Sequence, residues 1–404
     1  MLLIAGTFIC YLKEMIMNKI TFVIPSRNNL EFLELAYKSI RNLKTKHEIL
    51  ILDDASTDGT SEWITSLTDP DLLHYHNPGP ERIGIVGMFD KGIEIARTEI
   101  IMAFHADMVA GPDLDTNILK HLKPGTVVSA TRIEPPLHPP GVEKITVDFG
   151  IEAEQFDFDK WYTESEALKQ DKTTKGIFAP WCMYKSDFLG HDDLFAPQSK
   201  EDSDLFNRFI LSGYEVIQSW DALVYHFTCR GSRFNKQSGG GAGKNSNEWI
   251  HTTNKNSRNF IRKWGHFVKH DEYMNPIIPS KYNIGFVVKN CNMNILEMLE
   301  PWCDNIYIED MNLVNEYILR EQPNTKFILN NRVKNINNIS GNDVLIEFDG
   351  KLFGQSQFDF IQNLSEVLKD SAEVGIMEYD IFKFTINSLD TYEKTLINCK
   401  TNII

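Results

Sequence analysis

Three acidic residues, Glu201, Asp202 and Asp204, open a segment whose sequence pattern predicts a helix. The apolar residues that recur there at helical spacing are Leu205, Phe206, Phe209 and Ile210. Ser199 precedes Asp202 by three residues, as in a capping box, and Gly213 is a natural end for the helix. The positive end of the helix dipole favours ionised carboxylates in the first turn, so one of these acids could act as a general base. The alternative is that the acids only cap the helix, because helix starts favour acidic residues generally.

Further clusters of polar residues follow predicted strands. The strands are Ile20–Ile24, Glu48–Leu52 and Glu99–Phe104, and the clusters after them are Pro25–Asn29, Asp53–Asp54 and His105–Asp107. Helical patterns, among them the one over Leu30–Arg41, alternate with these strands, which predicts an α/β fold with a parallel sheet and helices on both faces. Ligands of such sheets bind at the carboxyl ends of the strands, so the clusters are candidates for one site. The pair His105 and Asp107 could hold a divalent cation against a diphosphate, although Asp and Asn are also common in ordinary turns.

The composition of the 404-residue chain limits its class. Its length exceeds that of a usual single core, so two domains are expected. The formal net charge of −15 argues against a nucleic-acid-binding protein, which would need a basic face. The six cysteines are scattered without a CxxC pair, which indicates reduced thiols in a cytoplasmic protein.

The chain begins with an apolar stretch, residues 1–12, that is about half as long as a membrane span. It lacks the basic leader and the cleavage pattern of a signal peptide. We therefore expect residues 1–16 to be a dispensable extension, with a weak peripheral contact to a membrane as the alternative. No transmembrane segment is expected.

Short motifs that occur in the same order in one known family run through the first half of the chain. They are Val23–Asn28, Ile51–Gly59, Gly84–Ala96, Ala103–Asp107, Glu201–Leu205, Gly213–Tyr214 and Tyr225–His226. In this order they resemble the family-two glycosyltransferases of the GT-A fold, over roughly residues 20–230. The resemblance implies that residues 17–275 form a GT-A nucleotide-diphospho-sugar transferase domain with a mixed, mostly parallel sheet.

The resemblance also assigns residues to a donor substrate, a nucleoside-diphosphate sugar. The matching residues are Pro25, Arg27, Asp53 and Asp54 at the nucleotide base, and Arg82 and Lys91 around the nucleotide and its phosphates. Asp90 stands where the family usually has Asn, so the match is weaker at this point of the chain.

The family's metal motif is Asp-x-Asp, and this chain has His105-Ala-Asp107 in its place. Asp107 matches the last ligand of the motif, while His105 replaces the first acid. His226 resembles a histidine that completes the metal site in some relatives; as a lone His after an apolar run it would otherwise be a core residue. Imidazole favours softer cations than Mg²⁺, so the resemblance implies Mn²⁺ as the first choice and Mg²⁺ as the second.

By position, Asp202 matches the family's catalytic base, and Glu201 is expected to orient the helix start or to touch the acceptor. The implied reaction is inverting transfer of a sugar to a hydroxyl group of a glycan or glycoconjugate. Two alternatives stay open. A sugar-nucleotide nucleotidyltransferase normally has a Gly-rich loop after its first strand, whereas Pro25–Asn29 contains no glycine. A non-catalytic protein that binds nucleotide sugars or glycans is favoured by the replacement at His105.

Pro276 and Pro279 mark a linker at 276–280, after which strand and helix patterns begin again. The expected strands are Ile284–Val288, Asn305–Ile308, Lys326–Leu329 and Asp343–Phe348, and the expected helices are Leu296–Leu299, Leu313–Arg320 and Phe358–Lys369. Residues 281–404 are therefore predicted to form a smaller accessory α/β domain with a parallel sheet.

Overall fold

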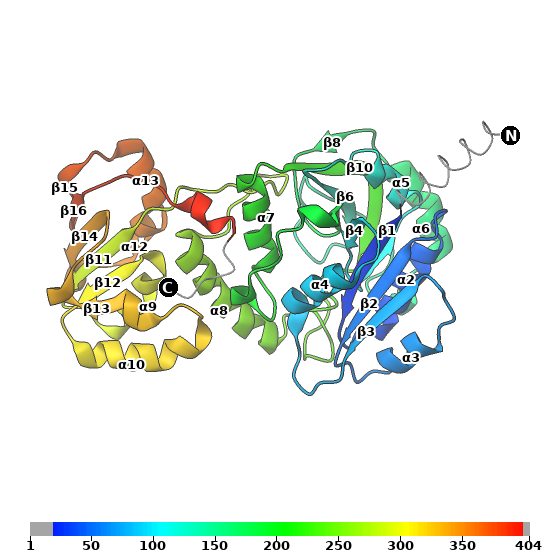
Figure 1. The fold of residues 1–404 in the computed structure, drawn as a ribbon, viewed down its shortest axis with the longest axis horizontal. Coiled ribbons are helices and arrows are strands. Elements are labelled where there is room, and N and C mark those ends of the chain that lie inside the picture. Colours follow the sequence, from blue (N-terminus) through cyan, green and yellow to red (C-terminus); the bar gives the residue numbers. More distant parts are fainter. Residues whose placement is uncertain (1–18, 399–404) are drawn as a thin grey trace, which may run out of the picture.

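Two β-sheets organise residues 19–398, the part of the chain that the computed structural model describes (Figure 1). The predicted extension, residues 1–16, lies outside the described residues. The larger sheet has the strand order β3-β2-β1-β4-β9-β6-β10-β5, and two short strands, β7 and β8, pair with β6 and β10. The smaller sheet has the order β13-β12-β11-β14-β16-β15 and lies at the opposite end of the molecule.

The elements of the first unit follow one another in chain order. They are β1 (Ile20–Ser26), α2 (Leu30–Arg41), β2 (Glu48–Asp54), α3 (Thr60–Ser66), β3 (Leu72–Asn77), α4 (Gly84–Ile95), β4 (Ile100–Ala103), β5 (Met108–Ala110), α5 (Leu114–Leu119), β6 (Thr126–Glu134), β7 (Ile145–Thr146), α6 (Phe158–Glu164), β8 (Thr173–Thr174), β9 (Trp181–Tyr184), α7 (Glu201–Leu211), β10 (Glu215–His226) and α8 (Asn247–Trp264).

Strands β1, β2 and β4 of the larger sheet are buried on both faces, whereas the edge strand β3 is partly exposed. Strands β3, β2, β1 and β4 run parallel, and β9 is antiparallel to its neighbours β4 and β6. Ile24 and Ile51 pack in one core with residues of α2, while Val23 and Leu52 pack in another core with residues of α4. Side chains of neighbouring strand residues point to opposite faces, so a continuous apolar run requires helices on both faces. The predicted mixed, mostly parallel sheet is confirmed.

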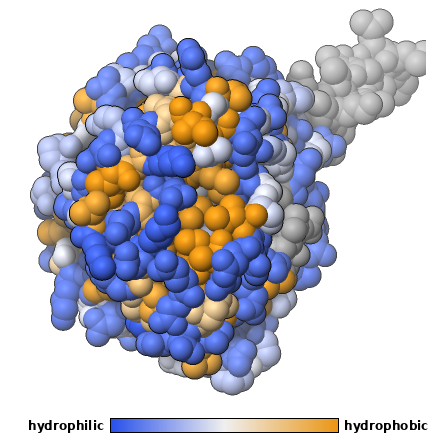
Figure 2. Space-filling model, turned by 90° about the vertical axis from the view of Figure 1, so that its left-hand side faces the viewer, coloured by the Kyte–Doolittle hydropathy of each residue, from blue (hydrophilic) through white to orange (hydrophobic). Residues whose placement is uncertain are grey.

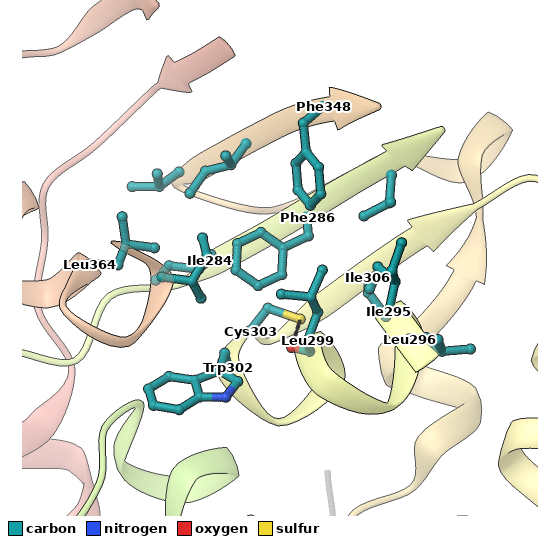
Figure 3. Close-up of a cluster of buried hydrophobic side chains, with 14 of the residues drawn as sticks. Ile284, Phe286, Ile295, Leu296, Leu299, Trp302, Cys303, Ile306, Phe348 and Leu364 are labelled. Carbon is teal, nitrogen blue, oxygen red and sulfur yellow. Dashed lines mark hydrogen bonds between the residues drawn. The ribbon is translucent and has the colours of Figure 1, made fainter. Parts of the chain in front are cut away.

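The elements of the second unit surround the smaller sheet. They are β11 (Ile284–Lys289), α9 (Met293–Leu299), β12 (Asn305–Ile308), α10 (Met311–Glu321), α11 (Leu329–Arg332), β13 (Val333–Asn335), β14 (Val344–Asp349), α12 (Gln355–Gln362), α13 (Leu364–Ser371), β15 (Gly375–Tyr379) and β16 (Phe382–Ile386). Strands β13, β12, β11 and β14 are parallel as predicted, whereas β16 and β15 add an antiparallel hairpin that was not predicted. Figure 3 shows the core beneath the sheet, where Phe286 and Ile306 face Leu299 and Trp302.

Two expectations for this unit were wrong. The segment 326–329 is not a strand, because the side chain of Gln322 binds the carbonyl of Phe327 and the N–H of Leu329, at 2.8 and 2.9 Å, and fixes a turn instead. The helix expected at 358–369 is divided at Asn363, whose side chain donates to the carbonyl of Asp359 at 2.9 Å. Both side chains compete with regular secondary structure for backbone groups.

One edge of the smaller sheet is strand β15, which among the described residues pairs with β16 alone. Its surroundings expose apolar side chains, with Val374 67%, Ile376 71% and Tyr379 56% accessible. Figure 2 views this end of the molecule and shows apolar patches between hydrophilic side chains. An unpaired edge strand with apolar side chains can pair with another chain. The accessory role predicted for residues 281–404 stays a prediction.

Helix α8 packs against both units, between which it lies in Figure 1. Its residue Ile261 belongs to the core of the second unit, while Phe260 and Trp264 pack with Val86 and Phe195 of the first. The helix ends at Trp264 because Gly265, with φ of 78°, adopts a left-handed conformation. Among the helices of residues 19–398, none is long and apolar enough to cross a bilayer.

Candidate active site

A cavity of about 350 Å³ opens at the carboxyl ends of β1, β2 and β4. Asp54, Asp107 and Asp202 all line this cavity, although they come from distant parts of the chain. The other predicted site residues that line it are Pro25, Arg27, Arg82, His105, Glu201 and His226. The parallel strands bring the first polar clusters to one edge of the sheet, and α7 and β10 bring the remaining residues to the same place.

His105, Asp107 and His226 form a cluster whose possible ligand atoms all lie within 4.8 Å of one another. His226 reaches this position because β10 pairs antiparallel with β5, where His226 is opposite Met108. Burial lowers the pKa of His105 and so favours the neutral imidazole that can bind a metal ion. Two imidazoles and a carboxylate form a donor set for a first-row divalent ion, which includes the expected Mn²⁺, whereas Mg²⁺ prefers oxygen ligands alone.

Asp107 is held in its ionised form by the groups around it. Its Oδ2 accepts hydrogen bonds from the N–H groups of Arg230, at 2.5 Å, and Gly231, at 3.4 Å. Burial by itself would raise the pKa of Asp107, but the charge of His226 and the Arg230 N–H hold it well below its usual range. The loop after β10 therefore orients the carboxylate, a role that the sequence did not indicate.

The two acids at the start of α7 have different surroundings. Asp202 is exposed, and its Oδ1 accepts from the N–H of Ser203 at 2.6 Å. The Oε2 atom of Glu201 is buried and has no hydrogen-bond partner among the described residues. Burial, together with the charge of Asp202, raises the pKa of Glu201 to about 8. At neutral pH Glu201 is therefore mostly protonated, while Asp202 presents its carboxylate to the cavity.

The capping box predicted at the start of α7 was wrong. Ser199 and Lys200 both have positive φ, 77° and 73°, and Lys200 is the N-cap without a side-chain cap bond. This backbone turns the Ser199 hydroxyl away from α7, and it lies 2.7 Å from the hydroxyl of Thr253 in α8. Positive φ is uncommon for such residues and concentrates at functional sites. Here the turn delivers Glu201 and Asp202 to the cavity.

Of the adjacent acids at the end of β2, only Asp54 lines the cavity. Its two oxygens accept from the N–H groups of Ile83 and Gly84, at 2.8 and 2.7 Å, so it fixes the loop that carries Arg82. Asp53 instead contacts His76 Nδ1 at 2.9 Å. Asp53 therefore lies next to the cavity, not in it.

Arg27 and Arg82 form a cationic end of the cavity. Arg82 contacts the carboxylate of Glu248, at the start of α8, and Arg27 lies 3.9 Å from the same carboxylate. The Nε atoms of both arginines are buried and lack a hydrogen-bond partner among the described residues. These donors suit an anionic ligand such as a diphosphate. Glu248 was not found from the sequence, because it is 166 residues from Arg82 and belongs to no motif.

Lys91 lies outside the cavity. It is on α4, pairs with Glu94 at 3.0 Å and borders a separate shallow hollow on the surface. Its position gives no support for contact with the phosphates.

Comparisons with known proteins agree with the motifs. Residues 21–189 match the model of glycosyl transferase family 2. The resemblance to family-two glycosyltransferases is thus confirmed for this segment, which ends before α7. The undecaprenyl-phosphate mannosyltransferase of Micrococcus luteus is 25% identical over 121 residues, or 29% of this chain. The match spans 49% of that relative, about half of its length.

Three solved structures show a partial likeness to this chain. The mannosyltransferase PcManGT of Pyrobaculum calidifontis, in complex with GDP-Man and Mn²⁺, is 22% identical with a TM-score of 0.36, covering 52% of this chain and 56% of its own. GalNAc-T7 with UDP, GalNAc and Mn²⁺ is 11% identical with a TM-score of 0.44, covering 63% and 48%. TarS 1–349 of S. aureus is 13% identical with a TM-score of 0.37, covering 52% and 60%.

Proposed function

We propose that this protein is a metal-dependent, inverting glycosyltransferase that moves a sugar from a nucleoside diphosphate to an acceptor hydroxyl of a glycan or glycoconjugate. The observation that carries the proposal is that Asp202 and the cluster of His105, Asp107 and His226 line one cavity. The family match over residues 21–189 supports sugar transfer in general.

In the proposed reaction Asp202 is the general base. Its exposed carboxylate takes the proton of the acceptor hydroxyl as the acceptor oxygen bonds to the anomeric carbon. The bond from that carbon to the diphosphate breaks on the opposite face, which inverts the configuration. Glu201, whose pKa is raised to about 8, would donate a hydrogen bond to a substrate oxygen at neutral pH. Mn²⁺ at the histidine and aspartate cluster would supply positive charge to the leaving diphosphate.

Arg27 and Arg82 would hold the donor diphosphate at the other end of the cavity. Both arginines line the cavity and their Nε atoms lack a partner among the described residues, which supports binding of phosphate oxygens there. Pro25 lines the same end and would form part of the pocket for the nucleotide. Asp54 contributes by holding the loop that carries Arg82.

The test compares Asp202→Asn with wild type on a panel of nucleotide sugars in the presence of Mn²⁺. We expect kcat to fall by about 10²–10⁴-fold, because a positioned base is lost, while the nucleotide Kd from calorimetry stays within about twofold. Asp107→Ala should instead weaken Mn²⁺-dependent donor binding. The control is Asp193→Asn, since Asp193 is an exposed acid paired with Lys326 outside the cavity.

Two results would contradict the proposal. Loss of nucleotide affinity in Asp202→Asn would assign Asp202 to the donor site and not to the acceptor. Donor binding by wild type without any turnover would favour a non-catalytic protein that binds nucleotide sugars.

A further inference from the structure

Glu134, at the end of β6, is a buried carboxylate that contacts a member of the cluster without lining the cavity. Its Oε1 lies 2.7 Å from Nδ1 of His226, and its side chain is 2% exposed. Strands β6 and β10 are parallel neighbours with Ile133 opposite Tyr225, so the next residue of each strand, Glu134 and His226, also lie side by side. The contact is therefore built into the sheet.

The hydrogen bond to Glu134 decides which nitrogen of His226 faces the cluster. With Nδ1–H donated to the carboxylate, Nε2 is directed toward Asp107, whose Oδ2 lies 3.7 Å away, and it also accepts from the N–H of Cys229 at 3.3 Å. A metal-binding histidine usually donates its second ring N–H to a carboxylate or carbonyl in this way, which fixes the ring and strengthens the ligand. Removing such a partner typically costs 10–100-fold in metal affinity.

Two cations stabilise the Glu134 carboxylate in its buried position. Lys144 Nζ donates to Oε2 at 2.8 Å, and Arg132 lies 3.5 Å from Oε1. Burying a carboxylate is costly unless charges and hydrogen bonds compensate it. The arrangement places a carboxylate that two cations compensate beside His226, and Glu134 is not among the residues that line the cavity.

We propose that Glu134 is a positioning residue that orients His226 for a divalent cation held with His105 and Asp107. This inference rests on the metal site of the proposed function. Glu134 acts through His226 and touches neither the donor nor the acceptor.

The test measures binding of Mn²⁺ alone by calorimetry, up to millimolar concentration, to the full chain. Glu134→Gln keeps the size of the side chain but removes its charge, and it should weaken Mn²⁺ binding by about tenfold or more. The matched control is Glu143→Gln, because Glu143 lies 4.0 Å from Arg132 in the same charge network but does not contact His226. The control should change Mn²⁺ affinity by less than about twofold.

A second readout separates positioning from a structural role. In turnover assays Glu134→Gln should need more Mn²⁺ for half-maximal rate, yet recover most of the wild-type kcat at saturating Mn²⁺. If the variant folds poorly because Lys144 loses its partner, the double variant Glu134→Gln/Lys144→Met removes both buried charges and should show the same loss of Mn²⁺ affinity.

The outcomes distinguish this inference from the proposed function. Equal Mn²⁺ affinity in wild type and Glu134→Gln would overturn the positioning role and leave the proposed function intact. Equal losses in Glu134→Gln and Glu143→Gln would also overturn it, since the effect would belong to the charge network. Absence of Mn²⁺ binding in wild type would remove the metal from both proposals.

Discussion

At the residue scale, the acids Glu201 and Asp202 are neighbours in sequence but differ in environment. Burial and the charge of Asp202 raise the pKa of Glu201 to about 8, so the folded protein keeps a proton that the unfolded chain releases above about pH 4.3. The associated stability is fully present below the unfolded pKa and is lost as pH rises toward 8. Folding at neutral pH therefore costs the uptake of a proton by Glu201, and folding at alkaline pH costs the burial of its charge.

Glu201→Gln should remove this cost because it replaces the acid with a neutral side chain of similar shape. We expect the variant and wild type to be similar near pH 4, and the variant to be more stable by over about 1 kcal/mol at pH 8, since one pKa unit corresponds to about 1.4 kcal/mol. Thermal unfolding across this pH range measures the difference. Glu62→Gln, at an exposed acid of α3, is the control. A stability difference that stays constant with pH would contradict the raised pKa.

The sequence was sufficient to select the residues of the candidate metal site, but not the groups that orient them. His105, Asp107 and His226 were named from motifs, and the structure brings them together. Glu134 could not be named, because it lies 92 residues from His226 and becomes its neighbour only through the pairing of β6 and β10. Lys91 shows the converse, since its place in a motif did not reveal that it pairs with Glu94 and is absent from the lining of the cavity.

At the element scale, α4 and the turn before α7 meet at Gly84, the first residue of α4. Gly84 has φ of 86°, and a methyl group added there would overlap the Cα, Cβ and carbonyl oxygen of Pro197. Its N–H also donates to Asp54 at 2.7 Å. The position therefore couples the loop that carries Arg82 to the turn that presents Glu201 and Asp202.

Gly84→Ala should damage both stability and donor binding. Positive φ costs an alanine about 1–2 kcal/mol, and overlap with Pro197 should add about 1–3 kcal/mol. The control is Gly213→Ala, because Gly213 has φ of 82° and no described atom within 4 Å of the added methyl group. Urea unfolding and nucleotide calorimetry measure both effects. Similar losses in the two variants, with nucleotide affinity unchanged in Gly84→Ala, would refute the proposed coupling.

Helices and strands were predicted correctly where the spacing of apolar residues in the sequence matches their packing in the folded protein. The helix expected at Leu30–Arg41 is α2 with the same bounds, because its apolar stripe packs on the sheet. The strand expected at 326–329 was wrong, since the pattern of apolar residues contains no information about the side chain of Gln322. The hairpin of β15 and β16 was missed, because its strands are short and β15 is largely exposed.

At the scale of the whole molecule, α8 connects the two units. Glu248 and Trp249 at its start lie beside the donor end of the cavity, while Arg258 and Arg262 reach into the second unit. A domain boundary near residue 275, as the sequence suggests, assigns α8 to the first unit. Helix α8 nevertheless packs in the cores of both units. The two prolines at 276–280 indicate where the chain passes from the larger to the smaller sheet. They do not indicate that α8, which precedes them, packs against both units.

Glu300 is the central acid of the contact between α8 and the second unit, and it is fully buried. It accepts from Arg262 at 2.7 Å, from Arg332 at 2.6 Å and from the hydroxyl of Tyr317 at 2.8 Å. Glu300→Ala would leave two buried arginines without their main countercharge, which should destabilise the protein by about 3–5 kcal/mol. Glu297→Ala is the control: its pair with Arg320, at 2.7 Å, is partly exposed on both sides and should contribute less than about 1 kcal/mol. Denaturant unfolding measures both variants, and the donor affinity of Glu300→Ala shows whether loosening α8 disturbs Glu248 and the arginines it contacts. If Glu300→Ala were no less stable than Glu297→Ala, the buried cluster would not hold the two units together.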